Sequence, residues 1–157
     1  YKLLGNSLQI ALISLSILLV NLQIFPDAKT VGTIYTSSEK NSEVQVAILE
    51  EVAAKKGLTV EKRTISSVND IQQAAQSLAG EVDAIWLPTD NNVASAMPQV
   101  VGVTDEAKIV TVCGEESMVY AGGTITYGIN FYMHFGIFFT GGINSTHCFG
   151  IWHHLQQ

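Results

Sequence analysis

The middle of this chain alternates between two hydrophobic patterns, one with the period of a strand and one with the period of a helix. The pattern predicts five strands, at residues 31–35, 58–65, 82–87, 108–112 and 124–129. It predicts helices between them, at residues 42–56, 69–79, 90–97 and 115–121. The run at residues 82–87 is nearly all apolar, which is typical of a strand covered on both faces.

The first predicted helix has residues suited to both of its ends. Ser42 and Gln45 have the spacing of a capping box, and two lysines followed by a glycine suit the C-terminal end. Val44, Ile48 and Val52 recur every four residues, which predicts the buried face of the helix.

The order of elements predicts the fold class and the edge at which a ligand binds. Strands that alternate with helices favour an α/β fold with a doubly wound parallel sheet of about five strands and helices on both faces. Asn69 is predicted to begin the second helix, and Thr89 or Asp90 to cap the third. Ligands bind at the carboxyl ends of such strands, so the candidate loops are residues 36–41, 88–92 and 113–117.

Charge is distributed unevenly along the 157 residues. The chain has 8 basic and 14 acidic side chains and a net charge of -6. Lys2 is the only charged residue before Asp27, and none follows Glu116. Solvated surface rarely lacks charge over such lengths, so both flanks differ from the middle. We therefore predict three regions: an uncharged apolar segment at 1–25, a domain at 26–143 and an irregular tail at 144–157.

Residues 8–25 form a stretch of 18 residues without charge, which is long enough for a membrane span. The stretch also has the character of a signal-peptide core. Gln9, Asn21 and Gln23 would be costly near the centre of a bilayer. Three interpretations stay open: a buried crossover helix, a membrane or signal segment, and sequence foreign to the domain.

Several kinds of chemistry lack support in the sequence. The acidic balance and the absence of a Lys/Arg cluster argue against a nucleic-acid partner. Cys113 and Cys148 have no zinc-site or disulfide-scaffold spacing. All four histidines follow the last charged residue, away from the three loops, which disfavours Ser/His or Cys/His catalysis. We therefore expect no enzyme activity, no metal and no cofactor.

Non-covalent binding of a zwitterion fits the polar residues of the loops. The amino end of the helix near Asn41 and Ser42 suits a carboxylate, and Asp90, Glu115 and Glu116 suit an ammonium group. An amino acid would fit both. Helix capping explains the first three residues equally well, and a solvated turn explains the two glutamates.

A series of short motifs resembles one protein family. The motifs are Phe-Pro-Asp-Ala-Lys at 25–29, Val-Gly-Thr-Ile-Tyr at 31–35, Glu-x-Asn-Ser at 39–42, Val-Asp-Ala-Ile at 82–85, Pro-Thr-Asp-Asn at 88–91, Gly-Glu at 114–115 and Tyr-Gly-Ile at 127–129. In this order they are similar to the substrate-binding proteins of ABC importers, in the branch that binds aromatic amino acids or peptides. The resemblance runs from about residue 25 to about residue 136.

The resemblance implies a function, a compartment and a set of contacts. It implies an extracytoplasmic protein, in the periplasm or at the cell surface, whose two lobes close on an amino acid or short peptide and deliver it to an ABC permease. The periplasmic-binding-protein type of lobe has no catalytic residues. By position, seven residues are expected to bind the ligand: Ser37, Ser38, Asn41, Ser42, Asp90, Asn91 and Glu115.

The chain also departs from the family pattern. Family members are about twice as long, so we expect one lobe and weak binding. Asn130 stands where the family has an acidic residue, and neither flank carries the expected charges. We hypothesise that both flanks are out-of-frame or fragment-derived sequence appended to a true lobe. The alternatives to a solute-binding lobe are a free-standing flavodoxin-like cofactor-binding domain and a sensor domain anchored in a membrane by residues 8–25.

Overall fold

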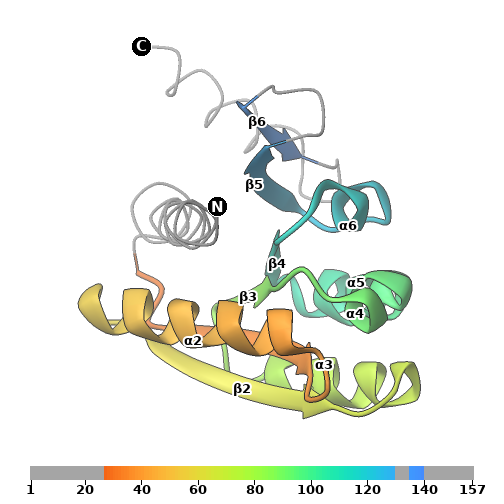
Figure 1. Ribbon diagram of the computed structural model, residues 1–157, viewed down its shortest axis with the longest axis horizontal. Coiled ribbons are helices and arrows are strands. Elements are labelled where there is room, and N and C mark those ends of the chain that lie inside the picture. Colours follow the sequence, from red (N-terminus) through yellow and green to blue (C-terminus); the bar gives the residue numbers. More distant parts are fainter. Residues whose placement is uncertain (1–26, 130–134, 140–157) are drawn as a thin grey trace.

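The computed structural model describes residues 27–129 and 135–139, and their strands form one sheet (Figure 1). The sheet has six strands in the order β2-β1-β3-β4-β5-β6. Their bounds are Thr30–Thr36 for β1, Thr59–Ile65 for β2, Ala84–Leu87 for β3, Val110–Cys113 for β4, Ile125–Ile129 for β5 and Phe135–Phe139 for β6.

The first five strands are parallel, as predicted, and the α/β class is confirmed. The sixth strand, β6, pairs with β5 in the antiparallel direction and lies outside the prediction. Its sequence, Phe-Gly-Ile-Phe-Phe, is a short apolar run that shows neither the strand period nor the helix period.

Helices cover both faces of the sheet, which confirms the doubly wound arrangement (Figure 1). The helix α2 packs on one face, and the other described helices pack on the opposite face. Their bounds are Lys40–Lys55 for α2, Ile71–Ala79 for α3, Asn91–Ser95 for α4, Met97–Ala107 for α5 and Glu116–Tyr120 for α6.

The prediction missed the helix α5 because its sequence looks unfavourable. A proline at its start and several valines weaken the helical signal. Pro98 lies in the first turn, where its missing N–H costs no intrahelical hydrogen bond. The third predicted helix is therefore two helices that meet at Ala96.

Two predicted helix starts are wrong. The helix α2 begins at Lys40, with Glu39 in the N-cap position, so Ser42 and Gln45 form no capping box. Both side chains are buried within the helix, whereas Val44 of the predicted buried face is 42% exposed. The second helical segment begins not at Asn69 but with the capping box of Ser67 and Asp70, before a 3-10 turn.

The core alternates along each buried strand. In β3, Ala84 and Trp86 point to the face covered by α2, and Ile85 and Leu87 point to the opposite face. All four are at most 3% exposed. This strand is nearly all apolar because it is buried on both faces, as the sequence predicts.

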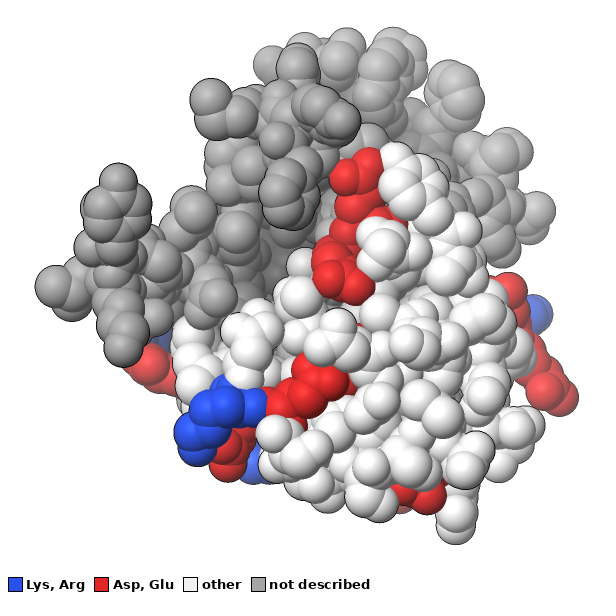
Figure 2. Space-filling model, turned by 45° about the vertical axis from the view of Figure 1, so that its right-hand side comes forward, with Lys and Arg blue, Asp and Glu red and all other residues white. Residues whose placement is uncertain are grey.

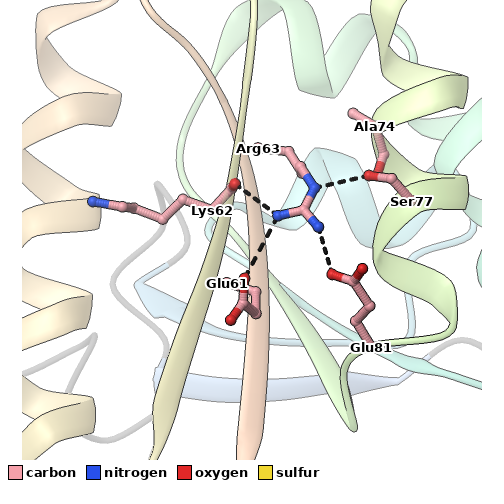
Figure 3. A network of polar contacts seen from close by, with 6 residues as sticks. All are labelled: Glu61, Lys62, Arg63, Ala74, Ser77 and Glu81. Carbon is pink, nitrogen blue, oxygen red and sulfur yellow. Dashed lines mark hydrogen bonds and ion pairs between the residues drawn. The ribbon is translucent and has the colours of Figure 1, made fainter.

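The strand β2 forms one edge of the described sheet and carries charged side chains (Figure 3). Arg63 donates from Nε to Ser77 Oγ at 2.9 Å and from Nη2 to Glu81 Oε2 at 2.5 Å. Its Nη1 lies 3.6 Å from Glu61 Oε2. These contacts tie the edge strand to the end of α3, and exposed charge on an edge strand disfavours pairing with another sheet.

Asp83 fastens the chain that enters β1 to the chain that enters β3. Its Oδ2 accepts hydrogen bonds from the backbone N–H groups of Lys29, at 2.7 Å, and Thr30, at 2.9 Å. Asp83 N in turn donates to Thr30 O at 2.9 Å. The amino ends of two neighbouring strands are thus joined by one side chain.

We expect the Asp83 contact to make the fold sensitive to acid. The N–H groups of Lys29 and Thr30 hold the pKa of Asp83 below its ordinary value of 3.8. The folded protein therefore binds this proton more weakly than the unfolded chain. The stabilisation is present above the ordinary pKa and is lost as the pH falls through the lowered value.

Asp83→Asn should remove this pH dependence. In urea denaturation at a series of pH values, the free energy of unfolding of the variant should be lower than that of the parent near pH 6, and the two should converge in acid. A constant difference between the two proteins across the series would contradict this role of Asp83.

Candidate functional site

Three loops meet at the carboxyl edge of the parallel strands. They follow β1, β3 and β4, which are neighbours in the sheet. The chain leaves β1 toward α2 on one face and leaves β3 toward α4 on the other face. This is the point at which the strand order reverses, where open α/β sheets bind ligands.

The carboxylate of Asp90 joins the first two loops. Its Oδ2 accepts from Thr36 N at 2.7 Å, and its Oδ1 accepts from Thr36 Oγ1 at 2.8 Å. Oδ1 also accepts from Asn92 N and Val93 N, each at 3.1 Å. The last residue of β1 is thereby fixed to the first turn of α4, and the predicted capping role of Asp90 is confirmed.

The backbone of Thr89 is held by the first turns of α2. Its carbonyl oxygen accepts from Asn41 Nδ2 at 3.2 Å and from Ser42 Oγ at 3.4 Å. Its N–H donates to Gln45 Oε1 at 2.9 Å. Polar residues on the inner side of α2 therefore position the loop after β3.

The carboxylate of Glu39 lies at the start of α4 rather than at the start of its own helix. Asn91 donates to Glu39 Oε2 from N at 3.3 Å and from Nδ2 at 3.4 Å. No side chain caps α2 in the structure. The first amides of a helix have no intrahelical acceptor, so the N-terminus of α2 is a favourable place for a negative group.

The third loop approaches the second through Gly114. A Cβ at this position would lie 2.7 Å from Leu87 O and 2.9 Å from Thr89 N. Both are backbone atoms, which cannot move aside cheaply. Glycine is therefore required here so that the loop after β4 can lie against the loop after β3.

Two glutamates follow Gly114 and are partly buried. Glu115 Oε1 accepts from Ser117 Oγ at 2.7 Å, and Glu116 accepts from the Tyr120 hydroxyl. That hydrogen bond raises the pKa of Tyr120. In Figure 2, where the side that carries α3 to α6 comes forward, acidic side chains stand out on a mostly uncharged face.

The seven predicted contact residues divide into two groups. Five lie at the surface of the carboxyl edge, either exposed or partly buried: Ser37, Ser38, Asn41, Asn91 and Glu115. Ser42 is 0% exposed and Asp90 is 1% exposed, and both bond to neighbouring loops. Both side chains are thus held by groups of the protein itself, and their assignment to the ligand stays a prediction.

The sequence pattern did not assign Thr36, Gln45 and Thr89 to the scaffold of the site, and it placed Gln45 and Thr89 in helix caps. Each acts through a contact with a residue more than 40 positions away in the chain. The one local indication of this scaffold was Gln45, a polar residue among the apolar residues of α2. Its spacing from Ser42 led to its interpretation as part of a helix cap.

Other kinds of site find no support in the described residues. Within that part of the chain, no group of three or more His, Cys, Asp or Glu side chains could hold a metal ion. Burial raises the pKa of Cys113 to about 12, so its thiol stays protonated and is a poor nucleophile. None of the helices formed by the described residues combines the length and the apolar character that crossing a membrane requires. The predicted membrane or crossover segment at 8–25 lies outside these residues.

Comparison with known proteins identifies one family. Residues 9–138 match the family model described as ABC transporter substrate binding protein. A tyrosine-binding protein of Clostridioides difficile is 40% identical over 106 residues, which cover 68% of this chain and 31% of that protein.

Solved structures give the same result. The ligand-free, open form of a substrate-binding protein with adhesive properties from Clostridium difficile has 43% identity and a TM-score of 0.68, over 71% of this chain and 38% of the other. A domain from Streptococcus pneumonia in complex with L-Trp has 36% identity and a TM-score of 0.70, over 73% and 40%. The chain thus spans about a third to two fifths of the length of these relatives.

The family match extends beyond the motifs that carry the resemblance. It begins within the uncharged N-terminal stretch and ends after Asn130. The match therefore argues against an out-of-frame origin for residues 9–25 and 130–138.

Asp90→Asn should destabilise the protein strongly. The amide group would place a donor against the donors that the carboxylate now accepts from, which weakens both the cap of α4 and the tie to β1. We expect a loss of about 2–4 kcal/mol in the free energy of unfolding, measured by urea denaturation. Asp105→Asn, at an exposed position near the end of α5, should change it by less than about 0.5 kcal/mol. Equal effects of the two substitutions would contradict the assigned role.

Gly114→Ala should destabilise the protein by about 1–3 kcal/mol, because the added methyl group overlaps the backbone of the loop after β3. Gly102→Ala is the matched control. It lies in α5 with nothing within 4 Å of the added Cβ, so we expect a gain of about 0.5–1 kcal/mol from helix propensity. Thermal and urea unfolding measure both. A neutral Gly114→Ala variant would show that the two loops are not in close contact.

Proposed function

We propose that this chain, which belongs to the ABC transporter substrate-binding protein family, binds an amino acid at the carboxyl edge of its sheet as one lobe of a two-lobed importer component. The family consists of binding proteins and not of enzymes, as the sequence led us to expect, and this supports non-covalent binding. It also disfavours the alternative of a flavodoxin-like cofactor domain. The chain covers 31% of its curated relative, so the second lobe is part of the proposal.

The observation that carries the proposal is the uncapped N-terminus of α2, which lies at the same carboxyl edge of the sheet as the loop of Glu115. A helix N-terminus attracts a carboxylate through its free N–H groups and its positive dipole end. Ser37, Ser38 and Asn41 lie on this loop and first turn and supply further donors. These residues are our proposed contacts to the ligand carboxylate.

The ammonium group of the ligand is proposed to face the acidic loop after β4. Glu115 lies beyond Gly114, which brings this loop against the loop after β3. Asn91 follows β3, the strand between β1 and β4, and its side chain, which donates to Glu39, is our further proposed contact to the ligand. Opposite charges at the two ends of the site select a free amino acid over a neutral amide.

The aromatic preference and the cellular role rest on relatives and are proposed by analogy. One relative is named a tyrosine-binding protein, and the structure of another contains L-Trp. Family members act outside the cytoplasm. We therefore favour an aromatic amino acid as ligand, closure of two lobes about a hinge as the mechanism, and an ABC permease as the partner.

Nuclear magnetic resonance of the ¹⁵N-labelled chain tests the ligand class, because this method detects weak binding by a single lobe. Titration with L-tryptophan should shift the amide signals of residues 37–42 and 114–117. N-acetyl-L-tryptophanamide, which keeps the aromatic ring and lacks both charges, should produce no comparable shifts. Equal responses to both compounds, or shifts confined to other residues, would contradict recognition of a zwitterion at this edge.

Glu115→Gln tests the ammonium subsite. The variant should bind L-tryptophan about two to five times more weakly than the parent, as expected for loss of one partly exposed ion pair. Glu106→Gln, which removes the same charge from an exposed position on α5, is the matched control and should bind as the parent does. The apparent dissociation constants come from the same titrations. Equal weakening by both variants would assign the effect to net charge.

A further inference from the structure

Thr89 links the two elements of the carboxyl edge that carry different parts of the proposed site. Its N–H donates to Gln45 Oε1 at 2.9 Å, and its carbonyl oxygen accepts from Asn41 Nδ2 at 3.2 Å, so α2 holds its peptide groups. Its hydroxyl makes a long contact of 3.5 Å to Gly114 O in the loop after β4. Thr89 is therefore a direct connection between α2 and the loop of Glu115.

Gln45 makes the shortest of these contacts, and it is 6% exposed. Its orientation is fixed, because the N–H of Thr89 can donate only to an oxygen atom, so Oε1 and not Nε2 of the amide group faces the loop. An N–H group shielded from water is costly to leave without an acceptor. The hydrogen bond from Thr89 to Gln45 therefore holds the loop after β3 in one position relative to α2.

The two proposed subsites lie on the two elements that Thr89 connects. The carboxylate subsite of Ser37, Ser38 and Asn41 is at the start of α2, and Glu115 of the ammonium subsite is on the loop after β4. The strand β3 lies between β1 and β4, so the loops of the two subsites do not follow paired strands. An amino acid carries both charged groups on one carbon atom, and it can contact both subsites only when their separation is correct.

We propose that Gln45 is a positioning residue for recognition of a zwitterion: it acts through Thr89 to set the separation between the carboxylate and ammonium subsites. It does not touch the ligand, because it is buried and its oxygen already accepts from the protein. This role rests on the proposed function, in which the edge binds an amino acid. A ligand that uses both subsites should depend on Gln45, whereas a ligand that uses only one should not.

Gln45→Met tests this role in the full ¹⁵N-labelled chain, because methionine has a similar length and only a weak acceptor. The dissociation constant of L-tryptophan, from nuclear magnetic resonance titration, should rise about two- to fivefold, since the loss is limited to what the ammonium subsite contributes. Indole-3-propionate, which lacks the ammonium group, should bind as it does to the parent. Gln45→Glu keeps an acceptor oxygen and should restore binding of L-tryptophan. The control Gln76→Met, at an exposed position of α3, should change neither ligand.

A double-mutant cycle tests whether Gln45 acts through the loop of Glu115. Glu115→Gln weakens L-tryptophan binding in the parent, according to the proposed function. In the Gln45→Met background the same substitution should have little further effect, because the ammonium subsite is already displaced. Additive losses in the cycle would overturn the positioning role.

Substitutions of Thr89 test the other half of the connection without a change in the buried glutamine. Thr89→Val removes the hydroxyl contact to Gly114 O and keeps both peptide groups. It should weaken L-tryptophan by about twofold and leave indole-3-propionate unchanged. Thr89→Ser keeps the hydroxyl and should bind both ligands as the parent does. These variants decide the question if Gln45→Met does not fold, which the dispersion of the amide signals shows.

The two ligands separate failure of the positioning role from failure of the proposed function. If the parent binds L-tryptophan no more tightly than indole-3-propionate, recognition of a zwitterion is contradicted, and the role of Gln45 is overturned with it. If the parent prefers L-tryptophan, but folded Gln45→Met and Thr89→Val variants weaken both ligands equally or neither, the two residues are structural only. That result overturns the positioning role and leaves the proposed function in place.

Discussion

The carboxylate of Asp90 is the contact on which the carboxyl edge of the sheet depends. The strands β1 and β3 are neighbours in the sheet. Beyond the last paired residues of each strand, the backbone N–H and C=O groups need other hydrogen-bond partners. Asp90 accepts from the backbone and hydroxyl of Thr36 and from the first amides of α4, and it is 1% exposed. A buried carboxylate with this set of donors fixes two loops in one arrangement, because removal of any donor leaves charge in the interior without compensation.

The same contact determines which helix N-terminus remains available. Asp90 and Glu39 both place carboxylate oxygens at the start of α4, so that helix dipole is already compensated within the lobe. The start of α2 receives no side-chain cap, although Glu39 stands in its N-cap position. The carboxylate of Glu39 therefore compensates the dipole of α4 and not that of α2. The start of α2 keeps free N–H groups, which suit an anionic ligand.

The fold followed from local patterns, whereas the scaffold of the site did not. The apolar run of β3 and the alternation of elements predicted a parallel sheet, because burial on both faces leaves a trace in the composition of each strand. Ser42 and Gln45 were assigned to a helix cap because their spacing matches one. Their true partner is the backbone of Thr89, more than 40 residues away. A local pattern contains no information about which distant carbonyl or N–H group a buried polar side chain meets.

The buried polar side chains of the carboxyl edge already have hydrogen-bond partners within the protein, and this affects how a ligand is held. Ser42, Gln45 and Asp90 already bond to the protein, so binding does not have to reorganise the interior of the lobe. The groups left for a ligand lie on the surface of one edge, and a single edge can cover only one side of a small molecule. Pockets with strong affinity bury most of the surface of their ligand. High affinity at such an edge therefore requires a second surface that closes over the first, and in the function we propose the edge described here is one half of that closure.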